Sequence, residues 1–154
     1  PRLIDMGVEP FLIVSTAKVI VAQRLVRRLT PAREQYFLSD GELTALGKVV
    51  DLEHARTFVE AEKLIKPGTP WKEIPFFRPK KSEESEDGYK GRVGIHEAIK
   101  ITSGIKEIIL RGGSADEVEA QAKKEGMMTM IEDGIFQAIQ GNTTIDEVLR
   151  VVSE

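Results

Sequence analysis

The sequence of 154 residues contains no cysteine and only two histidines, His54 and His96. Without cysteine the chain cannot form disulfides, use a catalytic thiolate or hold a zinc ion through sulfur, because each of these needs a sulfur donor. Two histidines are too few for a histidine-rich site. The composition therefore argues against transition-metal chemistry.

Long apolar runs are also missing. The most apolar segment, residues 11–26, is interrupted by Ser15, Thr16, Lys18, Gln23 and Arg24, so we expect no membrane span. The net charge of −3 gives no overall attraction to nucleic acid or acidic membranes. An apolar content of 41% is typical of a soluble globular protein with one core, or one core and a small subdomain.

The chain begins at Pro1 with neither an initiator methionine nor a signal peptide, and we interpret it as a piece of a longer protein. Residues 2–6 predict the last turn of a helix ending at Gly7, and Pro10 predicts the start of a short one. The β-branched residues of segment 19–26 favour a strand over a helix.

Capping boxes, in which a serine or threonine is followed three residues later by glutamate, predict three helix starts. They begin at Ser39, Ser114 and Thr144. Asp51 predicts the cap of a further helix that would end at Pro67-Gly68. Between that helix and the second box, we expect an aromatic edge strand or extended segment at 71–77, a solvated loop at 80–87 and a strand at 92–99.

After residue 99 the chain is divided by glycines into short amphipathic segments. We expect helices over 103–111, from Ser114 to Gly126, over 129–140 and from Thr144 onward, each with one buried face. This pattern predicts a compact C-terminal helical bundle.

Few residues point to chemistry on their own. The segment 41–48 has the wrong glycine spacing for a phosphate-binding loop, and valine follows its lysine where a hydroxyl is needed. The basic cluster of Arg24, Arg27, Arg28 and Arg33 could meet phosphates, but no aromatic residues interleave with it, which favours an ion-paired or solvated edge. We expect structural roles for both histidines, and capping or pairing for Glu132 and Asp133.

Five motifs occur in an order that resembles one known family. They are residues 6–12 (MGVEPFL), 22–29 (AQRLVRRL), 88–97 (GYKGRVGIHE), 126–134 (GMMTMIEDG) and 141–149 (GNTTIDEVL). Together they resemble the C-terminal part of the type II secretion and type IV pilus assembly ATPases, over roughly residues 1–30 and 88–152.

The resemblance implies a fold and a setting. It implies an α+β, mostly helical chain: residues 1–29 end a RecA-like ATPase core, 30–87 form an insertion subdomain, and 88–154 supply a closing strand and the helical bundle. The strands at 19–26 and 92–99 would be antiparallel. Family members are cytoplasmic, usually hexameric motors, peripheral to the inner membrane, that work through an inner-membrane platform protein.

The family's phosphate loop lies upstream of this chain. The resemblance therefore implies that ATP and magnesium belong to the parent protein, and that this chain holds no cofactor and is inactive alone. Gln23, Arg24 and Arg92 are our candidates for sheet closure or subunit contacts. No nucleic-acid partner is expected.

At the insertion, relatives hold a structural zinc with two Cys-x-x-Cys pairs. The resemblance places those positions on Thr30 and Arg33 and near Lys81 and Glu84, and only the last could supply a ligand. We expect no zinc here. The insertion would instead depend on the packing of Phe58, Leu64, Trp71, Phe76 and Phe77.

Two other functions remain open. One is a stand-alone helical interaction module that docks to a secretion motor or platform protein. The weaker one is a nucleic-acid binder that uses the cluster between Arg24 and Arg33.

Overall fold

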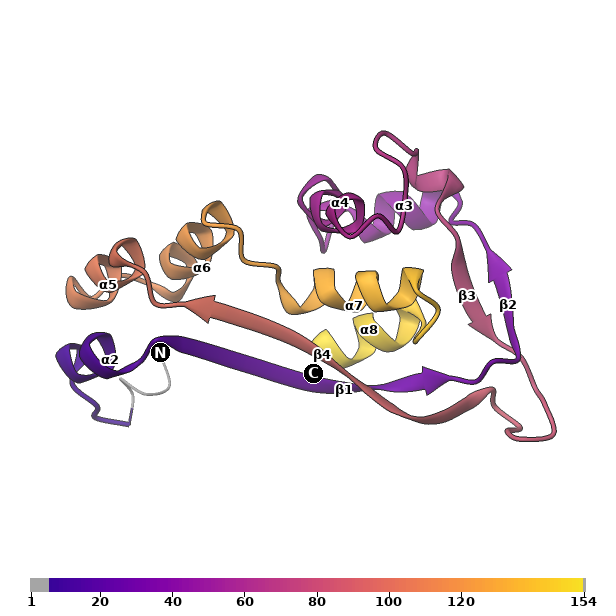
Figure 1. The fold of residues 1–154 in the computed structure, drawn as a ribbon, viewed down its shortest axis with the longest axis horizontal. Helices are drawn as coiled ribbons and strands as arrows, with labels where there is room; N and C mark the ends of the chain where they lie inside the picture. Colours follow the sequence, from indigo (N-terminus) through magenta and orange to yellow (C-terminus); the bar gives the residue numbers. More distant parts are fainter. Residues whose placement is uncertain (1–5, 154) are drawn as a thin grey trace. The chain divides into compact units, whose positions relative to one another are not determined.

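The computed structural model describes residues 6–153 and shows an α+β protein, as the sequence predicts (Figure 1). Within those residues there are seven α-helices and two small antiparallel sheets of two strands each. The helices are α2 (Pro10–Thr16), α3 (Asp40–Leu46), α4 (Leu52–Ala61), α5 (Ser103–Leu110), α6 (Ala115–Lys124), α7 (Met130–Ile139) and α8 (Ile145–Ser153). The strands are β1 (Val19–Leu29), β2 (Arg33–Tyr36), β3 (Phe76–Pro79) and β4 (Tyr89–Lys100), with a 3₁₀ turn, η1, at Trp71–Glu73.

The chain divides into two compact units. The first holds the described residues up to Ala22 together with Glu97–Thr129, and the second holds Gln23–His96 with Met130–Glu154. All four predicted C-terminal helices are present, with α5 and α6 in the first unit and α7 and α8 in the second. No helix among the described residues is long and apolar enough to cross a membrane.

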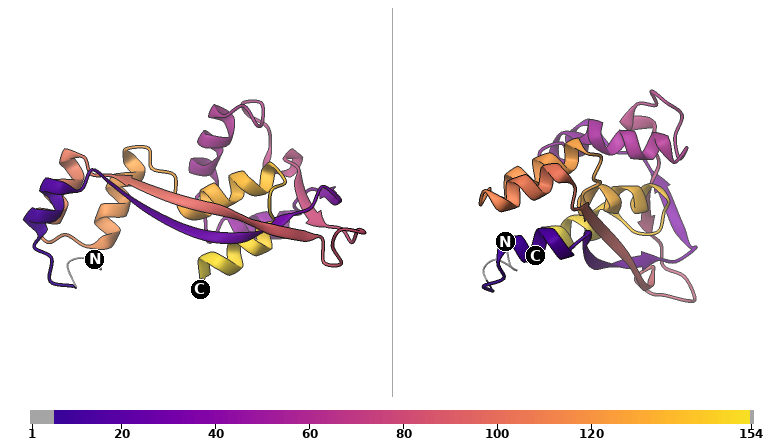
Figure 2. Two further views of the ribbon diagram at one scale, coloured as in Figure 1. Left: turned by 60° about the horizontal axis from the view of Figure 1, so that its bottom comes forward. Right: turned by 60° about the vertical axis from the view of Figure 1, so that its left-hand side comes forward.

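Strands β1 and β4 lie side by side in every view (Figures 1 and 2) and confirm the predicted antiparallel pair. At one end the Ile101 amide donates to the Lys18 carbonyl, and at the other the Thr30 amide donates to the Gly88 carbonyl, both at 2.9 Å. Gly88 has a φ of +76°, and a Cβ there would lie 2.7 Å from the backbone nitrogen of Lys80. Glycine is required at this turn because both its backbone angle and its surroundings exclude a side chain.

The first unit is a small helical cluster. Helices α2, α5 and α6 surround a core of Ile101, Ile105, Ala122 and Met127. Pro10 opens α2 as predicted, and Ser114 caps α6 with both hydrogen bonds of the capping box. The predicted helical turn at residues 2–6 lies outside the described residues, which begin at Met6.

The main core of the second unit is shared between the insertion and helix α7. Residues from α3, α4, η1 and β3 pack on Ile135, Ala138 and Ile139 of α7. The buried members are Leu38, Leu46, Val50, Ala55, Val59, Trp71, Ile74, Phe76, Ile135, Ala138, Ile139 and Ile145. Of the five residues expected to support the insertion, Trp71 and Phe76 are buried and Phe58 and Phe77 are half-buried, but Leu64 is exposed.

Helix α4 ends earlier than predicted. It stops at Ala61 rather than at Pro67, because Lys63 adopts a left-handed φ of 58°. The Lys63 amide then donates to the Glu60 carbonyl and the Leu64 amide to the Val59 carbonyl, which is the hydrogen-bond pattern of a Schellman cap. Leu64 therefore lies beyond the helix and is exposed, although the sequence predicts that it packs in the insertion.

The prediction of an edge strand or extended segment over 71–77 is correct for its second part and wrong for its first. Residues 71–73 form η1, and only from Phe76 does the chain become the strand β3. Its partner is β2, which the sequence did not predict; the register pairs Arg33 with Pro79 and Tyr36 with Phe76. The segment 80–87 is a turn-rich, mostly exposed loop, as predicted, with one bridge between Ser82 and Ser85.

We predict that Gly134→Ala lowers the free energy of unfolding by about 1–3 kcal/mol, the usual cost of overpacking. Gly134 lies in α7 against Val148 of α8, and an added Cβ would overlap both methyl groups of that valine. Chemical denaturation monitored by circular dichroism measures the change. Gly41→Ala is the matched control, since a Cβ there meets nothing within 4 Å in α3. Equal stability of the two variants would contradict close packing of α7 on α8.

Candidate functional site: an arginine-lined pocket

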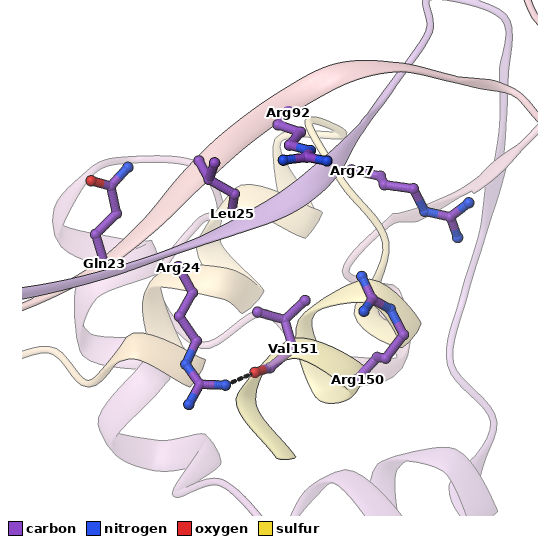
Figure 3. A pocket seen from close by; sticks show the side chains of 7 residues that line it. All are labelled: Gln23, Arg24, Leu25, Arg27, Arg92, Arg150 and Val151. Carbon is purple, nitrogen blue, oxygen red and sulfur yellow. Dashed lines mark hydrogen bonds between the residues drawn. The ribbon is translucent and has the colours of Figure 1, made fainter. Parts of the chain in front are cut away.

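An open pocket of about 690 Å³ lies in the second unit (Figure 3). Its lining comes from β1, β4 and α8 and contains four arginines. The lining residues are Gln23, Arg24, Leu25, Arg27, Arg92, Arg150 and Val151. The structure therefore brings Gln23, Arg24 and Arg92, the three candidates from the sequence, to one place.

The pocket is built on a buried carboxylate, that of Glu147 in α8, whose side chain is 3% exposed. Its Oε1 accepts a hydrogen bond from Nη2 of Arg27 at 2.7 Å, and its Oε2 accepts one from the Arg27 backbone amide at 3.1 Å. Arg150 adds bonds from Nε at 3.3 Å and from Nη2 at 3.0 Å. A buried charge is tolerated only when it is paired and hydrogen-bonded, and Glu147 meets both conditions.

These contacts alter the third predicted capping box. The Glu147 amide donates to the Thr144 hydroxyl at 3.2 Å, so half of the box is present. The Glu147 carboxylate, which the sequence pattern assigns to the helix start, instead binds Arg27, 120 residues away. The helix cap and the connection to β1 thus use the same residue.

Charge at the pocket follows from this arrangement. Burial by itself raises the pKa of Glu147, but the hydrogen bonds from Arg27 and Arg150 outweigh it and hold the pKa at about 2. The hydrogen bond to Glu147 also raises the pKa of Arg27. Both side chains therefore stay charged throughout the physiological range.

Three of the four arginines are held by the protein. The Arg27 guanidinium also lies 4.1 Å from the Tyr89 ring centroid and 3.3 Å from Oδ2 of Asp87. Arg24 extends toward α8 and donates to the Val151 carbonyl (Figure 3). Within the described part of the chain, Arg92 is exposed and forms no ion pair. The pocket thus presents one uncommitted guanidinium among fixed ones, an arrangement that suits a carboxylate or phosphate from elsewhere.

The rest of the basic cluster lies apart from this pocket. Arg28 and Arg33 line a second pocket of about 340 Å³ together with Lys90. The Arg33 guanidinium donates to the Gly141 carbonyl at the end of α7 and lies 4.7 Å from the Phe77 ring centroid. The arginines between 24 and 33 therefore do not form one continuous basic surface.

Both histidines face carboxylates of α7, an arrangement that the sequence did not reveal. Nδ1 of His54 lies 2.7 Å from Oε1 of Glu132, whose side chain is 1% exposed. The backbone amide of His96 donates to Oδ2 of Asp133 at 2.7 Å. Glu132 and Asp133 are the only charged residues of α7, a helix whose other residues are apolar except Gln137, and this was the available signal that they have buried partners. Their contacts are structural and connect α7 to α4 and to β4.

Comparison with known proteins identifies the family. Residues 1–150 match the family model described as Type II/IV secretion system protein. The chain belongs to this family.

Curated relatives agree with the assignment. The chain is 38% identical over 154 residues to the type II secretion system protein E of Xanthomonas campestris pv. campestris, covering 99% of this chain and 24% of that protein. It is 33% identical over 156 residues to the type IV pilus assembly ATPase PilB of Pseudomonas aeruginosa, with the same coverage. For PilB of Thermus thermophilus the identity is 36%, over 96% of this chain and 15% of the relative. The chain thus spans about a quarter or less of these relatives.

In this member of the type II/IV secretion family, the four positions assigned to zinc ligands do not fit a zinc ion. Thr30 is buried and its hydroxyl donates to the Ala32 carbonyl, while Arg33 binds Gly141. Lys81 pairs with Glu86 at 3.2 Å, and Glu84 lies 3.7 Å from Lys90. Two cations, a hydroxyl and one carboxylate cannot supply the thiolate or imidazole donors of a structural zinc site. Nor do the described residues contain any other cluster of three potential metal ligands.

We predict that Glu147 makes the stability of the protein sensitive to acid. A carboxylate whose pKa is lowered in the folded state stabilises that state above its unfolded pKa, near 4.3, and loses the effect as the pH falls toward 2. Glu147→Gln should be less stable than the wild type by about 3 kcal/mol at pH 7, and the difference should shrink between pH 5 and pH 2. Urea denaturation at a series of pH values measures it.

The matched control for that experiment is Asp146→Asn, on the adjacent residue. Asp146 is exposed and makes no ion pair among the residues described. A difference for Glu147→Gln that stays constant with pH, or equals that of the control, would contradict the assigned ion pairs.

We also predict that the purified protein contains no stoichiometric zinc, because the insertion lacks donors for it. Elemental analysis after expression in zinc-supplemented medium tests this, and treatment with a chelator should leave the unfolding midpoint unchanged. One zinc per chain would overturn the prediction.

Proposed function

We propose that this chain is the C-terminal part of a hexameric ATPase that powers type IV pilus assembly or type II protein secretion. Family membership and the homology to pilus and secretion ATPases support this proposal. In it, the parent protein works in the cytoplasm at the inner membrane, through a platform protein, and binds ATP and magnesium outside this chain. The chain itself contributes sheet closure and subunit contacts.

The exposed surface of β1 supports a role in sheet closure. Val19, Ile20, Val21 and Leu25 are exposed by 54%, 38%, 61% and 49%. Apolar residues in consecutive positions are typical of a strand that is covered on both faces. At the end of β1 the backbone groups already have hydrogen-bond partners, since the Leu29 amide donates to the Asn142 carbonyl and the Thr143 hydroxyl donates to the Arg27 carbonyl. We infer that residues 19–25 of β1 join a RecA-like sheet in the parent.

This reading assigns three regions. Residues 1–29 end the ATPase core, residues 30–87 form the cysteine-free insertion, and residues 88–154 supply the closing strand and the C-terminal helices, which contact neighbouring subunits. The proposal treats those helices as a bundle in the assembled parent. The insertion takes part in the same core as α7, so it would move with α7 and α8.

The proposed subunit contact rests on a single observation. The Arg92 guanidinium is exposed, whereas the other three arginines of the pocket are held by contacts within the chain. Such a site suits an anionic group that arrives from outside the chain. In the proposed motor, that anionic group belongs to a neighbouring subunit or to a ligand that the neighbouring subunit binds. Nucleic acid fits less well, because Arg27 already pairs with Glu147 and Asp87 and Arg33 with a carbonyl.

We predict that Arg92→Gln in the full-length protein lowers ATP hydrolysis about tenfold, as expected for the loss of one hydrogen bond to a charged group. Phosphate release and sedimentation velocity report activity and assembly in parallel. Arg28→Gln is the control, as an exposed arginine of β1 that lies outside this pocket. Equal loss in the two variants would indicate a general charge effect and contradict a specific role for Arg92.

The isolated 154-residue chain should release no phosphate. ATP turnover by this chain would refute the proposal that ATP is bound and hydrolysed outside it.

A further inference from the structure

Helices α3 and α8 enclose a groove of about 320 Å³ in the second unit, separate from the arginine-lined pocket. Ala45 and Leu46 line it from α3, Val49 from the turn that follows α3, and Ile145 and Leu149 from α8. Ile145 and Leu149 are four residues apart in α8, which places them on one face of that helix. The result is a mainly aliphatic groove beside the core that supports the insertion.

Large apolar side chains at the groove are left in contact with solvent. Val49 in its lining is 58% exposed, and Leu149 is half-buried. Apolar surface gathered around a hollow with a polar margin is typical of a site for another protein. Helix α3 has seven residues and is thus about 10 Å long, which limits the contact to about two helical turns of a partner.

The polar margin of the groove is acidic. Glu42 and Asp146 both line it. Glu42 is held by Ser39, which lowers the pKa of Glu42, and lies 3.8 Å from Arg78. Asp146 has no ion pair in the described part of the chain. Burial, and then the negative charge of Asp146, raise the pKa of the Tyr36 phenol, while Arg78, whose guanidinium lies 4.0 Å from the Tyr36 ring centroid, lowers it.

We propose that this groove docks a short segment of another protein in which leucine-type side chains stand next to lysine or arginine. The aliphatic walls would take the apolar side chains, and Asp146 would meet the basic one. An acidic segment would be repelled by the two carboxylates. This inference stands apart from the proposed motor function, since it rests on the groove alone.

The probe is a synthetic 14-residue peptide with leucines at helical positions i, i+3, i+4 and i+7 flanked by lysines. It is titrated into the isotopically labelled 154-residue chain and followed by NMR. We expect chemical-shift changes at Ala45, Val49 and Leu149. The same peptide with glutamate in place of each lysine should bind at least about five-fold more weakly. Shifts spread over surfaces outside the groove, or equal binding of the two peptides, would overturn the proposal.

Two variants of the protein make the test specific. Asp146→Lys should weaken binding of the lysine peptide about five-fold and improve binding of the glutamate peptide. Asp116→Lys is the matched control, because Asp116 is exposed and takes the same place in the first turn of α6 as Asp146 does in α8. If both substitutions weaken binding equally, net charge alone attracts the peptide and the proposal fails. Groove resonances that shift on dilution of the unliganded chain would instead show a second copy as the occupant, and would also overturn it.

Discussion

The buried carboxylate of Glu147 is the interaction on which the second unit depends. It accepts hydrogen bonds from the backbone and side chain of Arg27 and from Arg150, so it fixes α8 against β1 and sets the positions of two arginines in the pocket. The loop before α8 continues this attachment, through Asn142 to Leu29 and through Thr143 to Arg27. Without Glu147, Arg27 and Arg150 would lose the carboxylate that they share, and the end of β1 would lose a backbone partner.

Local signals in the sequence predicted local structure well. Ser39 and Ser114 each begin a helix with a complete capping box, Asp51 caps α4, and Pro10 opens α2. Such signals act over three or four residues, and nothing distant competes with them there. The exceptions have local causes. Lys63 takes the left-handed position that glycine usually occupies, so the end of α4 was hidden. Strand β2 reads Arg-Glu-Gln-Tyr, and it lacks the apolar alternation by which a strand is recognised.

The site was predictable only in part. Gln23, Arg24 and Arg92 came from a motif resemblance, and they share one pocket because β1 and β4 pair. The contact that organises the pocket was not predictable, since Arg27 and Glu147 are 120 residues apart. The same holds outside the pocket for His54 and Glu132, which are 78 residues apart. A carboxylate in a capping-box pattern is indistinguishable in sequence from one that serves an ion pair. Only the three-dimensional structure shows that Glu147 binds arginine.

The packing of the core explains how the insertion can be stable without cysteines. A small insertion without metal must bury apolar surface somewhere, and a subdomain of this size has little interior of its own. Here it uses helix α7, whose Ile135, Ala138 and Ile139 complete the core formed by Trp71, Phe76 and their neighbours. His54 and Glu132 add a polar contact across the same interface. Arg33 joins β2 to the Gly141 carbonyl, just after α7. The insertion is thus stabilised by contacts with α7, which fix its position on the helix that also holds β4 through Asp133.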